Sequence, residues 1–152
     1  LVYAAASLHW TERAGRWSRA ADLLIPQGVF ASFGGQLHLA DAEVEARVQA
    51  ARAPYLSDDE VPAPDGTPST SPMQWPGTEL LASDLFTDVR QSTIPRRLTL
   101  SAADYVGHLS TISAYLVVPA ADRAAMFDAV RVVLPEQVEL TADIVLHLAR
   151  KV

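Results

Sequence analysis

The chain has 152 residues, of which 49% are hydrophobic and 20% charged, a balance typical of one globular domain with an apolar core. Its net charge of −6 argues against a protein that binds a nucleic-acid backbone, because such binding depends on basic patches. No apolar run is long enough to span a membrane, and the absence of cysteine excludes disulfides and thiolate metal sites.

The first part of the chain predicts a strand, a helix and a second strand. Leu1–Leu8 is an apolar run suited to a strand that is buried on both faces of a parallel sheet. Thr11 is the expected N-cap of a helix that ends at Pro26–Gly28, and Val29–Phe33 is a second short strand. This order predicts a βαβ unit. Because the chain opens directly in an apolar strand, we expect that it is cut from a longer sequence.

The middle of the chain combines one helix with a long segment that has no periodicity. Asp41 is expected to cap a helix with Val44 and Val48 on one face. Residues 54–77 hold six of the ten prolines, and such a length predicts a lid-like insertion within a single domain spanning 1–152. The acidic run Asp58–Glu60 within it is read as a solvated loop, and no metal site is expected.

The last part predicts alternating strands and helices. A short helix over 78–83 precedes a strand over 86–93, which Pro95 would confine to a sheet edge or a bulge. Ser101 begins a helix with apolar residues at helical spacing up to Leu116, and a second helix covers 119–134. A final strand is expected over 138–148.

Four sequence stretches carry a resemblance to a known family. They are YAAASLHW, LLIPQGVFASFGG, LFTDVR and the segment from Tyr105 to Tyr115. In this order they resemble class I S-adenosylmethionine (SAM)-dependent methyltransferases, in the small-molecule branch related to trans-aconitate methyltransferases. The resemblance implies an α/β, Rossmann-like three-layer sandwich, of which this chain would be the C-terminal half with strands four to seven. The last strand would run antiparallel between the fifth and sixth.

The resemblance implies that the full-length protein transfers a methyl group from S-adenosylmethionine to a small-molecule acceptor. The family's Gly-rich loop after the first strand and its acidic residue after the second are absent from the printed sequence, so we expect this segment to be inactive alone. Two alternatives are a non-catalytic small-molecule binding module and an interaction fragment. In each case the exposed first strand would pair with a missing N-terminal half or with another chain. The Ala- and Arg-rich composition is typical of GC-rich bacteria, and we expect a cytoplasmic protein.

The residues after the first strand are the candidate cofactor and catalytic residues. By resemblance, the backbone of Ala5, Ala6 and Ser7 would contact the methionine part of SAM; alternatively, their small side chains only allow close packing. His9 would accept or hold a proton of the acceptor, or would cap the following helix. Trp10 would line the cofactor pocket and face the sulfonium, or would pack in the core.

The candidate substrate residues come from two segments, the Pro-rich stretch 54–77 and the stretch from Tyr105 to Tyr115. Trp75 in the first segment would cap the substrate site, or would only anchor the loop. The resemblance implies that the second segment is a helix that covers the substrate. Polar residues interrupt the apolar stripe of this helix and would bind the substrate if they face a pocket. If they face solvent, they would have no role. Ser110 and Ser113 are three apart and share a face. Arg96–Arg97 would clamp a carboxylate, or remain a solvated pair. The proposed substrate-binding set is Trp75, Tyr105, His108, Ser110, Ser113 and Tyr115.

Overall fold

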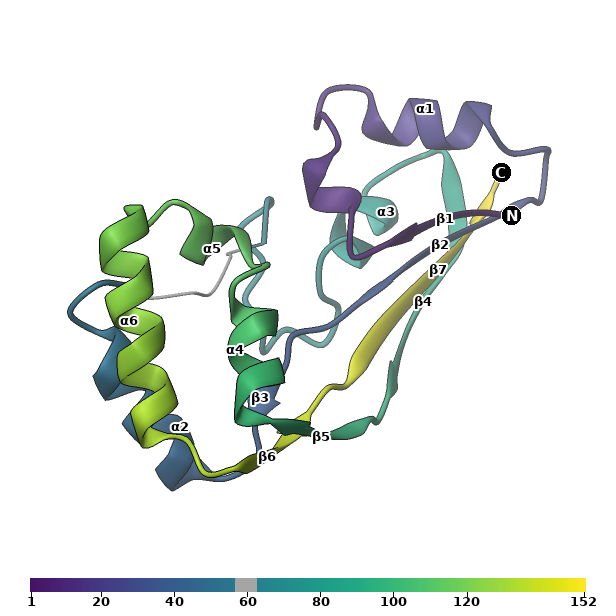
Figure 1. Cartoon of the computed structure of the whole chain (residues 1–152). Coiled ribbons are helices and arrows are strands. Elements are labelled where there is room, and N and C mark those ends of the chain that lie inside the picture. The colour runs from purple at the N-terminus through teal and green to yellow at the C-terminus, as the bar shows by residue number, and fades with distance from the viewer. Residues whose placement is uncertain (57–62) are drawn as a thin grey trace. The chain divides into compact units, whose positions relative to one another are not determined.

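The computed structural model describes residues 1–56 and 63–152, which form two compact units (Figure 1). The described residues of unit 1 are 1–36, 63–95 and 143–152, and those of unit 2 are 37–56 and 96–142. The segment 54–77 is therefore shared between the units, and its acidic run Asp58–Glu60 lies outside the described residues. The single domain with a lid-like insertion stays a prediction.

Unit 1 is built on a four-stranded sheet whose strands lie in the order β1-β2-β7-β4 (Figure 1). β1 (Val2–Ala5) runs parallel to β2 (Val29–Gly34), which confirms the predicted pairing. β7 (Ile144–Lys151) is antiparallel to both β2 and β4 (Phe86–Ile94), so the last strand lies between two earlier ones, as expected. The mixed α/β class is confirmed, whereas the three-layer sandwich stays a prediction.

The core of unit 1 lies on one face of this sheet. A 3-10 helix (Leu8–Trp10), α1 (Arg16–Asp22) and α3 (Gly77–Leu81) contribute to it. Its buried members are Leu8, Ala21, Leu24, Phe30, Leu80, Phe86 and Ala149. The side chains of β1 alternate between half-buried and exposed, and Tyr3 is 64% exposed. The expected burial of this strand on both faces is therefore wrong.

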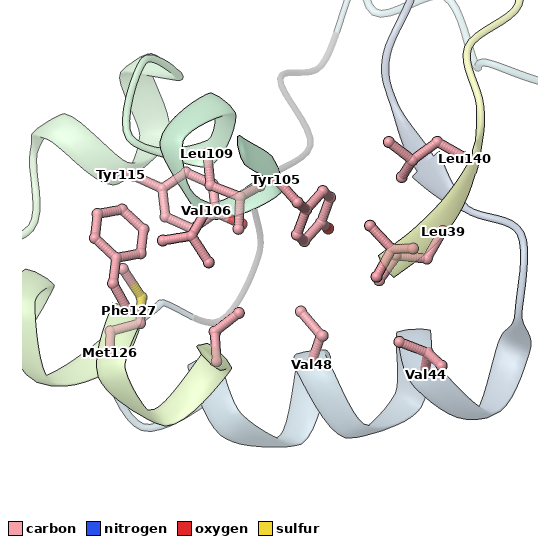
Figure 2. Packing of buried hydrophobic residues seen from close by; sticks show 12 residues of the cluster. Leu39, Val44, Val48, Tyr105, Val106, Leu109, Tyr115, Met126, Phe127 and Leu140 are labelled. Carbon is pink, nitrogen blue, oxygen red and sulfur yellow. The ribbon is translucent and has the colours of Figure 1, made fainter. Parts of the chain in front are cut away.

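Unit 2 combines a small antiparallel sheet with four helices. Its strands β3 (His38–Leu39), β6 (Gln137–Thr141) and β5 (Arg97–Ser101) lie in the order β3-β6-β5. Its helices are α2 (Ala42–Arg52), α4 (Ala102–Leu109), α5 (Ser113–Leu116) and α6 (Ala120–Val133). Figure 2 shows their apolar side chains pointing toward one another, with Val44 and Val48 of α2 below Tyr105 and Val106 of α4.

The predicted cap at Asp41 and the predicted helix start at Ser101 are confirmed, and the predicted cap at Thr11 is wrong. Asp41 Oδ1 accepts hydrogen bonds from the backbone N–H groups of Glu43 and Val44, and Ser101 Oγ accepts one from Asp104. Thr11 instead follows the 3-10 helix, where its hydroxyl donates to the Leu8 carbonyl. The helix expected from Thr11 begins only at Arg16, after Gly15 with a positive φ of 70°.

Two predicted elements are divided in the structure. The strand expected over 138–148 breaks at Ala142, so β6 and β7 belong to different sheets. The helix expected from Ser101 to Leu116 stops at Leu109. There the hydroxyls of Ser110 and Thr111 donate to carbonyls three residues earlier, and such bonds compete with helix continuation.

Candidate functional site

The candidate site lies where the two parallel strands of unit 1 end. After β1 the backbone turns at Ala6, which has a positive φ of 45° and donates its N–H to the Phe33 carbonyl at 2.8 Å. Ala5, Ala6 and Ser7 are all exposed. A Cβ on Gly34, at the end of β2, would lie 3.4 Å from Ala6 Cα, so the two strand ends are close. In open α/β sheets, ligands bind at the carboxyl ends of parallel strands.

The 3-10 turn that follows brings the predicted catalytic residue to the same strand end. Leu8 is buried and anchors the turn, while His9 and Trp10 are exposed. The imidazole and indole centroids lie 5.1 Å apart, and Trp10 is 71% exposed. Trp10 is therefore not a core residue here. An exposed imidazole beside an exposed aromatic face can both exchange a proton and contact a cation.

The predicted substrate residues fall in different units. Trp75 belongs to unit 1 and the other five to unit 2. In unit 2, Tyr105 and Tyr115 are buried in the core (Figure 2). The Tyr115 hydroxyl accepts a hydrogen bond from Arg52 at 2.9 Å. His108 and Ser113 are half-buried, whereas Ser110 is exposed and bonded to Gly107. The role of all six residues in substrate binding stays a prediction.

The segment around Trp75 is fixed to the sheet by side-chain hydrogen bonds. Gln91 on β4 accepts from the Gln74 backbone N–H at 2.7 Å and lies 2.9 Å from His147 Nε2, while its amide donates to the Pro72 carbonyl. Nearer the start of this segment, Asp65 accepts hydrogen bonds from Thr78 and Thr67. Residues 63–77 are thus tied to β4 and α3 at several points.

One imidazole and one carboxyl group in this region, those of His147 and Asp65, have shifted pKa values. Burial lowers the pKa of His147 below its usual 6.5, and a backbone hydrogen bond with Gln74 acts in the opposite direction. Burial tends to raise the pKa of Asp65, but the hydrogen bonds from Thr78 and Thr67 outweigh it and lower that pKa. Both groups hold the Trp75 segment in place.

Arg16 is a residue of this region that the sequence patterns did not identify as a candidate. It is 4% exposed, its guanidinium binds Thr11 twice, and it lies near Glu79 and over the Trp75 ring. Charged side chains are rarely buried unless they are paired. Its partner Glu79 comes 63 residues later, so no local pattern could have revealed the pair.

A hollow of about 350 Å³ opens on unit 2, where α2 begins beside β3 and β6. Its lining residues are Leu39, Ala40, Asp41, Val44, Pro135, Gln137, Val138 and Glu139. None of the sequence-predicted site residues is among them. Asp41 there accepts hydrogen bonds from two N–H groups in the first turn of α2 as a helix cap.

Comparison with solved structures shows a likeness in fold. No protein family and no curated protein matches the sequence. The fold is similar to the solved structure of a "Putative Type II Methyltransferase" from Anaeromyxobacter dehalogenans, with a TM-score of 0.59 and 24% identity. The match covers 97% of this chain and 63% of that protein, so this chain spans less than two thirds of its length. Within the described residues, no helix is long and apolar enough to cross a membrane.

Proposed function

We propose that this chain is the C-terminal half of a SAM-dependent methyltransferase that methylates a small molecule. The observation that carries this proposal is the strand order β1-β2-β7-β4, with a parallel pair and a last strand inserted antiparallel beside it. The likeness in fold to a protein described as a methyltransferase supports it. The small-molecule branch follows from the sequence resemblance.

The residues at the end of β1 fit one part of the cofactor. Ala5, Ala6 and Ser7 have small, exposed side chains that leave their backbone accessible to the methionine end of SAM. Trp10 presents an exposed aromatic face, which suits a sulfonium cation. When bound, SAM supplies an electrophilic methyl group. The loop and the acidic residue that would hold its adenosine are absent from the printed sequence, so we propose that activity requires residues beyond this chain.

His9 is the proposed catalytic residue. A methyl transfer is an in-line displacement in which the protein mainly positions the acceptor and excludes water. The imidazole would hydrogen-bond an acceptor hydroxyl or carboxyl, or would take its proton. His9 is exposed next to the strand end that carries Ala5–Ser7, so its ring is accessible to an acceptor.

A second candidate function is an interaction module, and the two edges of the sheet favour it. β4 has the features of a protected edge: an irregular register between Thr87 and Arg90, an ion pair of Arg90 with Asp88 at 2.8 Å, and Pro95 directly after it. β1 has no charge, proline or bulge and pairs on one side with β2. We propose that its other side pairs with a further strand, from an N-terminal half or from another chain.

Binding of S-adenosylhomocysteine, measured by calorimetry, tests the proposed function. We expect a longer form that carries residues before Leu1 to bind it, and this chain alone to bind it far more weakly. In the longer form, His9→Ala should lower kcat by roughly 10²–10⁴-fold and leave this affinity unchanged.

Three results would contradict these assignments. Tight binding by this chain alone would show that the cofactor site is misplaced. A longer form that does not bind S-adenosylhomocysteine would contradict the methyltransferase proposal and favour the interaction module. Unchanged turnover in His9→Ala would make His9 structural.

A further inference from the structure

Arg16 is a charged side chain placed in the interior of unit 1. Its side chain is 3% exposed, and burial of a guanidinium is costly unless its donors are paired. Nε donates to Thr11 Oγ1 and Nη2 to the Thr11 carbonyl, both at 2.8 Å. Nη1 lies 3.5 Å from Glu79 Oε2. The guanidinium therefore directs its donors to two separate segments of the chain.

The first segment is the turn that carries His9 and Trp10. Thr11 closes this turn, because its backbone N–H and its hydroxyl both donate to the Leu8 carbonyl, at 3.0 and 2.7 Å. The Trp10 N–H donates to the Ser7 carbonyl. By binding both oxygen atoms of Thr11, Arg16 holds the closing residue of the turn rather than its exposed tip.

The second segment is α3 together with the residues before it. Glu79 on α3 also accepts a hydrogen bond from Trp17 Nε1 at 2.9 Å, so its carboxylate joins α1 to α3. The Arg16 Cζ atom lies 5.4 Å from the centre of the Trp75 ring, within the range of a cation–π contact. The same guanidinium thus touches Thr11, Glu79 and Trp75.

We propose that Arg16 is a positioning residue that fixes the Leu8–Thr11 turn against α3 and Trp75. It thereby fixes the backbone position of His9 and Trp10 at the carboxyl end of β1. The importance of that turn for catalysis rests on the proposed function, whereas the positioning itself does not. Lysine cannot replace it, because the contacts need several donors in a fixed plane and a flat face for the indole.

Hydrogen exchange of this chain, followed by NMR, tests the proposal without any cofactor. In Arg16→Lys, the amides of Trp10 and Thr11 should exchange about tenfold faster or more, since directed hydrogen bonds to a charged group are lost. The amides of Gln27 and Lys151, which pair across the far end of the sheet, should exchange as before. Arg19→Lys is the matched control, because Arg19 binds two carbonyls of the same region but is exposed.

Glu79→Gln is the second variant, and it keeps the test decisive if Arg16→Lys does not fold. It retains an oxygen for Trp17 but removes the charge beside Arg16. Faster exchange at the amides of Trp10 and Thr11 is the expected result, because Arg16 links Glu79 to Thr11. Unchanged exchange there, or an equal increase at Gln27 and Lys151, would overturn the proposal. Failure to bind S-adenosylhomocysteine would leave it standing.

Discussion

The two units of the chain use buried polar groups differently. Among the described residues, the buried polar or charged side chains are Arg16, Ser32 and His147, and all three lie in unit 1. The buried cluster of unit 2 has twelve hydrophobic residues. Buried polar groups require directed partners, whereas an apolar core tolerates rearrangement as long as its volume is filled. The buried arginine and histidine side chains therefore lie in the unit that carries the strand-end site, whereas unit 2 holds the buried hydrogen-bonded hydroxyl of Tyr115.

One ion pair from each unit illustrates this contrast, although unit 1 also holds the exposed Arg90–Asp88 pair. In unit 1, Arg16 and Glu79 have side chains that are 3% and 22% exposed. In unit 2, Arg131 and Asp128 on α6 form a shorter pair at 2.6 Å, but their side chains are 52% and 77% exposed. Exposed pairs contribute little to stability, whereas removal of one partner from a buried pair is costly. The distance between the charged atoms therefore does not by itself show which pair contributes more to stability.

The largest expected effect tests the apolar character of unit 2. Leu140 on β6 is fully buried in its core, so Leu140→Ala should lower the free energy of unfolding by about 2–5 kcal/mol. Urea unfolding measures the change. The control is Val132→Ala on α6, where the side chain is 84% exposed and the change should stay within about 0.5 kcal/mol. Equal effects of the two substitutions would contradict the assigned core.

A smaller effect compares one glycine from each unit. A Cβ on Gly35 would lie 2.0 Å from the backbone oxygen of Asp143, so Gly35→Ala must displace backbone between β2 and β7. We expect a loss of roughly 1–3 kcal/mol, as for overpacked sites. Gly107 in α4 has open space around the same position, and Gly107→Ala should stabilise by about 0.5–1 kcal/mol. Thermal unfolding of both variants checks the opposite signs, and a neutral Gly35→Ala would contradict the close approach.

How much the sequence could predict also differs between the units. In unit 1, the apolar runs and the resemblance gave the parallel pair β1–β2 and the place of β7 in the sheet. In unit 2, β5 and β3 were missed, and β6 was merged with β7. The break falls at Ala142, whose N–H donates to Arg96, a residue 46 positions earlier. Such a turn depends on a distant partner and leaves no periodic signal.

The candidate site was predictable to a similar, partial extent. Ala5–Ser7, His9 and Trp10 were identified by the family resemblance, and the structure places them at one strand end. Arg16 was not identified, because a single arginine at the start of a helix is usually solvated and its burial depends on Glu79. The polar spacing that suggested a pocket-facing helix included Tyr105 and Tyr115, yet both rings are buried in the core.

The smallest expected effect concerns His147, the buried imidazole of unit 1. Burial lowers its pKa below 6.5, so the folded chain takes up this proton only at lower pH than the unfolded chain does. As the pH falls through about 6.5, the unfolded state binds more protons, and the free energy of unfolding must fall with it. We expect His147→Gln to flatten this acid-side slope in urea unfolding at several pH values. Leu140→Ala is the control, because it lowers stability without removing a titrating group and should keep the slope of the parent chain. A parental slope in His147→Gln would mean that the fold does not hold this imidazole in its neutral form.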